Sequence, residues 1–294
     1  MQPEIIVDYQ NVVGEGPLWN SKEKKLYWVD IMTGRIFRYD PVTGEHSQFF
    51  QGPIVGGFTI QKDGSLLLFM EGPSVAELRN GKLSYLIKDL PGSSDFRFND
   101  VIADPAGRVF CGTMPIDSSK AMDDGVTGKL YRLDTDGSIQ VVVDRVSLSN
   151  GLGFTPDRTQ MYYTDSLAYK IYIYDYDEET GDISNKRSFK DIPEGGGVPD
   201  GMTVDSEGYV WSASAGGAEL NRYNPEGEDD IVVNFPTAKI ISSVAFGGIL
   251  MDEIFVTTIG GDSKEENGKD SGALFRVKLG IKGVTDFCSN INFG

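Results

Sequence analysis

The sequence predicts an all-β fold: a six-bladed β-propeller with four strands in each blade. The 36 glycines in 294 residues are about twice the ordinary share. With 13 tyrosines and 16 phenylalanines, they indicate many short strands joined by tight turns. A short unit also recurs along the chain, and no amphipathic helical window separates its copies. Because no linker or change of composition divides the chain, we expect one domain over residues 1–294.

Each copy of the repeat begins with a polar or small residue, often followed by glycine, and continues as an apolar strand that ends in a turn. The clearest copy starts at Asn150, where Asn-Gly-Leu-Gly-Phe runs into Thr-Pro-Asp. The six copies start at Glu15, Gly56, Asn99, Asn150, Asp200 and Ser242. These starts are 41, 43, 51, 50 and 42 residues apart. Such a spacing accommodates four short strands and is typical of propeller blades.

Further strands follow within each copy. In the first copy, a second strand is expected at 25–30 and a third at 35–40, and the turn at Thr43-Gly44 leads into a fourth. The segment 4–9, which precedes the first copy, also has the character of a strand. We expect it to pair into the last blade and close the ring, because an open propeller would leave a strand edge unpaired.

The charge excludes several kinds of partner. With 27 basic and 44 acidic residues, the formal net charge is −17, which disfavours nucleic acid and anionic membranes. Most of this charge is expected to be solvated surface. No apolar run approaches the ~18 residues of a membrane span, and the first residues lack the features of a signal peptide. We expect a cytoplasmic protein that is a monomer or a weak homo-oligomer.

Cysteine and histidine are too scarce for several common sites. Cys111 lies in a strand-like run, where a buried free thiol is expected, and Cys288 completes no disulfide framework. His46 is the single histidine and lies in a predicted turn. A zinc site with several histidines is therefore excluded, and a Ser-His-Asp or Cys-His arrangement would need His46 itself.

The six starting residues of the copies predict a site on the propeller axis. The first strand of each blade lines the central channel, so equivalent positions meet around one rim. Five of the six side chains carry oxygen and none is basic; turn chemistry at strand entries is the alternative explanation. Hard oxygen ligands favour one divalent ion, with Ca²⁺ expected first and Zn²⁺, Mn²⁺, Mg²⁺ or Fe²⁺ as alternatives. A shell of three protein ligands would leave room for water and substrate.

Several strings, in order along the whole chain, resemble the gluconolactonase, regucalcin and luciferin-regenerating-enzyme family. They include Gly-Glu-Gly-Pro-Leu-Trp from Gly14, Arg-Phe-Asn-Asp from Arg97, Ser-Asn-Gly-Leu from Ser149 and Pro-Asp-Gly-Met from Pro199. The resemblance implies a six-bladed propeller that hydrolyses lactones with the help of a metal ion. This agrees with the fold that the repeats predict independently.

The resemblance also implies roles for individual residues. Glu15, Asn150 and Asp200 fall on metal-ligand positions, and Asp200 is in addition the candidate catalytic base. Arg97 and Asn99 fall on substrate-contacting positions; a structural ion pair is the alternative for Arg97. Asp117 falls on a position where some members of the family carry a carboxylate that binds sugar hydroxyls. This assignment is the weaker one, and an ordinary exposed loop aspartate is the alternative.

The chain departs from the family pattern around the expected pocket. Val101 stands where many members have glycine, the stretch 213–217 lacks a tryptophan that many lactonases carry, and Ile241 precedes the serine of the sixth copy. The identity of the substrate is therefore open. We expect hydrolysis of a gluconolactone-like sugar lactone to the aldonic acid. The alternatives are a metal-dependent aryl-ester or organophosphate hydrolase and a non-enzymatic Ca²⁺-binding propeller.

Overall fold

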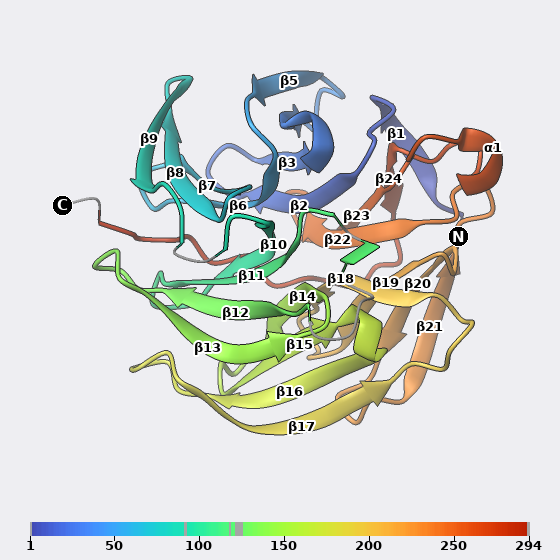
Figure 1. Ribbon diagram of the computed structural model, residues 1–294. Coiled ribbons are helices and arrows are strands. Elements are labelled where there is room, and N and C mark those ends of the chain that lie inside the picture. The colour runs from blue at the N-terminus through green and yellow to red at the C-terminus, as the bar shows by residue number, and fades with distance from the viewer. Residues whose placement is uncertain (1, 91–92, 118, 121–125, 293–294) are drawn as a thin grey trace.

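The computed structural model describes residues 2–90, 93–117, 119–120 and 126–292. In these ranges the chain forms six four-stranded antiparallel sheets, which stand around a common centre as the blades of a propeller (Figure 1). The predicted fold class is confirmed.

The strands of the first three blades are β2 (Gly14–Asn20), β3 (Lys25–Asp30), β4 (Arg35–Tyr39), β5 (His46–Gln51), β6 (Val55–Ile60), β7 (Leu66–Met70), β8 (Ser74–Arg79), β9 (Lys82–Ile87), β10 (Phe96–Ala103), β11 (Val109–Pro115), β12 (Gly128–Leu133) and β13 (Ile139–Val146). Those of the last three are β14 (Ser149–Phe154), β15 (Gln160–Asp165), β16 (Lys170–Tyr176), β17 (Ile183–Asp191), β18 (Val198–Val204), β19 (Val210–Ala215), β20 (Glu219–Tyr223), β21 (Asp229–Asn234), β22 (Ile241–Gly247), β23 (Glu253–Thr258), β24 (Ala273–Val277) and β1 (Glu4–Asp8). The described helical elements are η1 (Ile31–Thr33), η3 (Ser166–Ala168) and α1 (Lys264–Asn267).

The N-terminal strand closes the ring as predicted. In the sixth blade, β1 is the outermost strand and pairs antiparallel with β24. Val7 of β1 is buried, and Arg276 of β24 forms an ion pair with Glu4 at 2.9 Å. The first described strand therefore completes a sheet whose other three strands come from the far end of the chain.

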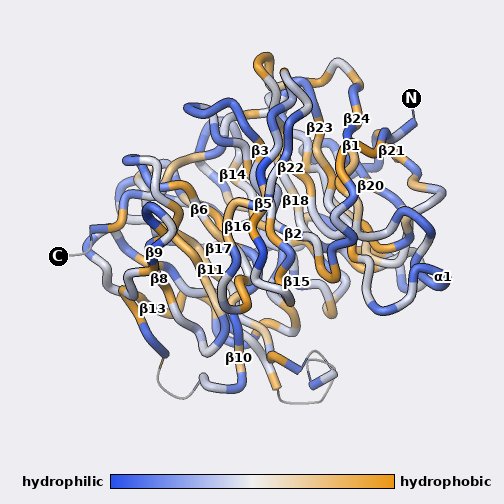
Figure 2. Tube along the Cα trace, turned by 90° about the horizontal axis from the view of Figure 1, so that it is seen from above, coloured by the Kyte–Doolittle hydropathy of each residue, from blue (hydrophilic) through white to orange (hydrophobic). Residues whose placement is uncertain are grey.

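The core lies between the blades. Six clusters of buried apolar side chains each join two neighbouring blades, including the pair made by the sixth and the first. Middle strands face a cluster on either side; Tyr162 and Tyr163 of β15, for example, belong to different clusters. This explains why such strands are apolar without alternation. Hydrophobic stretches follow the strands, whereas many connecting loops are hydrophilic (Figure 2).

All six inner strands share one irregularity. β2, β6, β10, β14, β18 and β22 each shift register with their neighbour at the predicted starting position of the repeat or directly after it. A β-bulge redirects side chains and bends the strand. The repeated unit in the sequence therefore corresponds to this bulge and to the part of the inner strand that follows it.

The C-terminal tail, residues 278–292, crosses the end of the propeller at which the inner strands finish. It pairs by isolated bridges with Asp205 of the fifth blade and Gln61 of the second. Its Asn290 N–H donates to the Gly107 carbonyl in the third blade at 2.8 Å. The tail thus connects blades that lie apart in the sequence. None of the described helices has the length and apolar character needed to cross a bilayer.

Candidate metal and substrate site

The predicted site residues sit at the bulges of the inner strands. Glu15, Asn99, Asn150 and Asp200 lie in β2, β10, β14 and β18, and they are 4%, 5%, 4% and 7% exposed. Four polar side chains are thus almost fully withdrawn from solvent at equivalent places in four blades. Buried polar groups need partners, so the bonds they make determine what the site can hold.

The remaining two of the six repeat-start positions, Gly56 and Ser242, have structural roles. A Cβ atom added to Gly56 would lie 1.9 Å from the carbonyl oxygen of Phe98 in the next inner strand, so only glycine fits there. The Ser242 hydroxyl donates to the Gly14 carbonyl at 2.6 Å and links the sixth blade to the first. For Ser242, the local hydrogen-bonding explanation therefore holds.

A chain of hydrogen bonds joins three blades through the candidate residues. Arg97 Nη1 donates to Asn99 Oδ1 at 2.7 Å, and Asn99 Nδ2 donates to Asn150 Oδ1 at 2.6 Å. Asn150 Nδ2 donates to the hydroxyl of Ser166 at 2.8 Å, which donates in turn to the carbonyl of Pro199 at 2.6 Å. Pro199 directly precedes Asp200, so the chain ends at the backbone of another candidate ligand.

At both ends of this hydrogen-bond chain, the direction of the hydrogen bond is fixed. A guanidinium only donates and a carbonyl only accepts, so every bond between Arg97 and Pro199 must run in the same direction. The Asn150 amide is therefore oriented with its nitrogen toward Ser166 and its oxygen toward Asn99. An amide oxygen has two lone pairs, and Asn99 uses one of them. The second remains available to a cation.

Acidic groups gather around the same positions. Burial, followed by the nearby carboxylates of Asp200 and Asp100, raises the pKa of Glu15 well above its ordinary value. Burial and Asp100 likewise raise the pKa of Asp200. Burial lowers the pKa of Arg97 to about 10, against the opposing effect of these three carboxylates, so the guanidinium stays protonated at neutral pH. Three carboxyl groups thus lie near a single guanidinium, and the raised pKa values mean that protons or a bound cation must neutralise the excess acidic groups.

The donor set fits one divalent cation. Buried charges in proteins are paired or coordinate metals, and carboxylate and amide oxygens are the ligands of hard cations. In the ranges that the structure describes, no three His, Cys, Asp or Glu side chains are grouped so as to hold a metal by themselves. A metal at the ring would therefore need the Asn150 amide and water in addition to Glu15 and Asp200.

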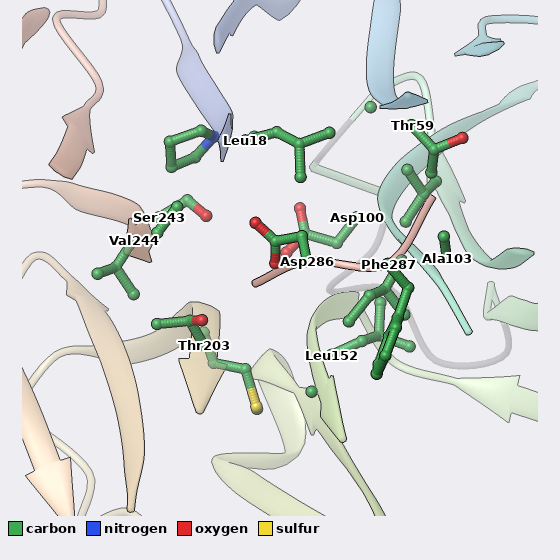
Figure 3. Close-up of a pocket in the computed structure, with 18 of the residues that line it drawn as sticks. Leu18, Thr59, Asp100, Ala103, Leu152, Thr203, Ser243, Val244, Asp286 and Phe287 are labelled. Carbon is green, nitrogen blue, oxygen red and sulfur yellow. The ribbon is translucent and has the colours of Figure 1, made fainter. Parts of the chain in front are cut away.

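A cavity of about 110 Å³ occupies the propeller axis beyond the ring (Figure 3). It is lined by residues that follow the ring positions in the inner strands and, from the tail, by Val284–Phe287. Asp100 and Asp286 both face it, and burial raises the pKa of Asp286 to about 7. Arg97 instead precedes Asn99 in β10 and lies toward the face where the inner strands begin, away from the tail. A role in binding substrate on that face stays a prediction.

Asp117 takes no part in the hydrogen-bond chain of the other candidate residues. Its exposed carboxylate accepts hydrogen bonds from the backbone N–H and the hydroxyl of Ser119, at 3.1 and 2.7 Å. These bonds are those of a local turn. A role in binding sugar hydroxyls stays a prediction.

Sequence reasoning missed two residues that belong to the site. Asp100 was passed over although it follows Asn99 at the position where two other copies have Gly151 and Gly201, which is a signal in the printed repeat. Ser166 is the first residue of the Ser-Leu-Ala string that forms η3, and no pattern marks it. Asp100 acts on the site through its charge, and Ser166 through hydrogen bonds to Asn150 and to Pro199 of the next blade.

The two cysteines and the histidine offer no alternative centre. Cys111 is a free thiol buried in the cluster between the second and third blades, and burial raises its pKa well above the ordinary value. His46 is exposed at the start of β5, where it shares a hydrogen bond of 2.8 Å with the Tyr9 hydroxyl. Neither is arranged for nucleophilic catalysis.

Known proteins are similar to this chain in both sequence and fold. The chain is 46% identical to Pentonolactonase XacC of Haloferax volcanii, over 98% of both chains. It is 34% identical to regucalcin of Danio rerio, over 97% of both. Among solved structures, a luciferin-regenerating enzyme superposes with a TM-score of 0.89 at 28% identity, covering 98% of this chain and 100% of the other.

A family model for the SMP-30/Gluconolactonase/LRE-like region matches residues 13–260. This range contains all six inner strands and all the residues of the ring. With relatives above 30% identity over nearly the whole length, the match assigns the family. The chain belongs to the SMP-30/gluconolactonase/LRE-like family.

Proposed function

We propose that this protein is a lactonase that opens a sugar lactone to the aldonic acid with the help of one divalent metal ion. The observation that carries the proposal is the oriented hydrogen-bond chain from Arg97 to Pro199, because it fixes the Asn150 oxygen at the same level of the propeller as the buried carboxyl groups of Glu15 and Asp200. Glu15, Asn150 and Asp200 would be the metal ligands. Ca²⁺ suits this oxygen set best, and Zn²⁺, Mn²⁺, Mg²⁺ and Fe²⁺ are the alternatives.

The reaction adds one water molecule to a cyclic ester. The water oxygen bonds to the carbonyl carbon, the bond from that carbon to the ring oxygen breaks, and the ring oxygen leaves as a hydroxyl group. A bound divalent ion supplies Lewis acidity to the carbonyl. A carboxylate oxygen of Asp200 would accept one proton from the water, and that proton then passes to the departing ring oxygen.

Arg97 and Asn99 would face the substrate on the side where the inner strands begin. The Arg97 Nη1 nitrogen is occupied by the Phe98 carbonyl and Asn99 Oδ1, at 2.9 and 2.7 Å. Its remaining N–H groups can bind the carbonyl oxygen as negative charge develops there, or a ring hydroxyl. Asp117 is the weaker candidate for contacts to sugar hydroxyls.

The substrate class follows from the relatives and remains broad. One relative is named a pentonolactonase, and another, at 31% identity, a 6-deoxy-6-sulfogluconolactonase from Pseudomonas putida. We therefore propose an aldonolactone and leave open whether it has five or six carbons. The higher identity of the pentonolactonase makes a five-carbon lactone the first to test.

A pH-stat assay on a panel of five- and six-carbon aldonolactones, an aryl ester and an organophosphate tests the proposal. We expect lactone hydrolysis above the spontaneous rate, its loss after chelation and its recovery on addition of Ca²⁺. Preferred turnover of the aryl ester or the organophosphate would favour the other hydrolase chemistry. Metal binding without turnover of any substrate would favour a non-enzymatic calcium-binding protein, and activity that survives complete metal removal would contradict the metal requirement.

A further inference from the structure

We propose that Ser166 is a positioning residue of the metal site, which fixes two ligands from different blades through one hydroxyl group. Ser166 opens η3 directly after β15, and its side chain is completely buried. The inference deepens the proposed function and rests on it, since it takes Asn150 and Asp200 as metal ligands. Ser166 would touch neither metal nor substrate.

The hydroxyl has a single hydrogen, and the structure uses it. Ser166 Oγ donates to the Pro199 carbonyl at 2.6 Å, so it can only accept from Asn150 Nδ2, which lies 2.8 Å away. The amide nitrogen of Asn150 is thereby held toward Ser166, and Oδ1 is turned toward Asn99. Through its bond to the Pro199 carbonyl, the same hydroxyl also fixes the peptide group between Pro199 and Asp200.

The fold does not require a hydroxyl at this position. The Ser166 N–H donates to the Leu148 carbonyl, in the segment that enters the inner strand. Four other blades make the equivalent backbone bond, from Ile31, Glu71, Ile116 and Ile259. The same backbone geometry is thus formed with isoleucine in three blades and glutamate in one. Serine stands in the blade of Asn150, whose amide nitrogen donates to it. In the blade of Asn99, the other amide, the equivalent residue is Ile116, and the Asn99 amide nitrogen donates to Asn150 and to the Ser149 carbonyl instead.

Loss of the hydroxyl would affect the site in two ways. The Nδ2 group of Asn150 and the carbonyl of Pro199 would both lose a buried partner. The Asn150 amide could then turn, and the backbone before Asp200 would be less constrained. Loss of an outer partner of a metal ligand typically weakens metal affinity about 10- to 100-fold.

Calorimetric titration of the metal-free protein with Ca²⁺ alone tests this directly. We expect Ser166→Ala to raise the dissociation constant for Ca²⁺ at least about tenfold. The matched control is Thr164→Val, two residues earlier in β15. Thr164 is also completely buried, but among the described residues its hydroxyl has no hydrogen-bond partner. Its removal should leave the affinity within about twofold, because no ligand depends on it.

Kinetics separate positioning from general damage. At saturating Ca²⁺, Ser166→Ala should recover a kcat within about threefold of the wild type, since the ligands themselves are present. Ser166→Cys, nearly isosteric but with a weak S–H donor, should bind Ca²⁺ more weakly than the wild type and decides the question if the alanine variant does not fold. Wild-type affinity in a folded Ser166 variant would overturn this inference alone. A wild-type protein that binds no divalent ion would overturn the proposed function together with it.

Discussion

The inner strands β6 and β14 make the same bulge at the same place in the ring, yet they carry opposite kinds of residue. Gly56 in β6 has no side chain, because the Phe98 carbonyl leaves no room for a Cβ atom. Asn150 in β14 has a side chain that is held by Asn99 on one side and Ser166 on the other. A register shift at the same place in the blade therefore serves close packing in β6 and, in β14, holds an amide in a fixed orientation.

This difference indicates how a repeated scaffold comes to have one site. The bulges place six residues around the axis, but only some of the neighbouring strands leave space for side chains. Where space exists, hydrogen bonds to adjacent blades orient the group. Substitutions at the proposed ligand positions should therefore reduce activity without loss of the fold, whereas substitution at Gly56 should destabilise the fold.

The largest effect is expected for Asp200→Ala, a change at a proposed ligand position. Loss of the candidate base and metal ligand should reduce lactone turnover about 1,000-fold or more. The free energy of unfolding measured without metal should not fall, because the change removes one of several neighbouring buried carboxylates. Steady-state kinetics and urea unfolding on the same sample provide both numbers. Turnover close to wild type in the purified variant would remove Asp200 from the site.

Gly56→Ala tests the packing side of the comparison. The new Cβ would meet the Phe98 carbonyl oxygen at 1.9 Å, so the second and third blades must move apart. We expect a loss of about 3 kcal/mol in the free energy of unfolding. Gly196→Ala is the matched control, since the nearest atom to its new Cβ is the Pro193 carbonyl at 3.5 Å. Equal stability of the two variants in urea would show that the bulge of β6 tolerates a side chain.

The third prediction compares two candidate ligands with each other. Glu15→Gln should weaken metal affinity about 100-fold and Asn150→Ala about tenfold. The glutamine removes a negative charge from a site that must balance a divalent ion, whereas the alanine removes a neutral oxygen. Titration calorimetry with Ca²⁺ gives the order. A greater loss for Asn150→Ala would mean that the orientation of the amide matters more than the charge.

The smallest effect is expected for Arg97→Lys. A lysine keeps the charge but not the planar fork of donors, so turnover on sugar lactones should fall about tenfold, or roughly 1.4 kcal/mol. Metal content should stay unchanged, since the proposed ligands lie in three other blades. Kinetics combined with elemental analysis measures both. Near-normal turnover would assign Arg97 to a structural ion pair, and parallel loss of metal and activity would place it in the support of the metal.

The fold could be predicted from the sequence because its repeat is local. Each copy contains its own bulge, strands and turns, so six starting positions suffice to give the number of blades and the inner strands. The closure by β1 follows from the need to cover a strand edge. The path of the tail, residues 278–292, could not be predicted. Its hydrogen-bond partners, such as Gly107, come from several blades and lie within reach of the tail only in the folded propeller.

The candidate site was predictable only as a set of positions. The repeat places Glu15, Asn150 and Asp200 in equivalent strands, but it carries no information on which way an amide or a hydroxyl points. That depends on contacts between blades, as with Ser166 and the Pro199 carbonyl, and on space, as at Gly56. Ser242 illustrates the limit: its hydroxyl fits the pattern of oxygen ligands and bonds to the backbone of the first blade.

The pairing of β1 with β24 also has a consequence for the order of events on the ribosome. Glu4 and Arg276, which form an ion pair in this sheet, are separated by 272 positions in the chain. At a synthesis rate of about 5–20 residues per second, β1 emerges tens of seconds before its partner strand exists. β1 is thus made before the other strands of all six blades, and five blades can form before its partner strand is available. A propeller closed in this way reaches its final shape only after β24 has been synthesised.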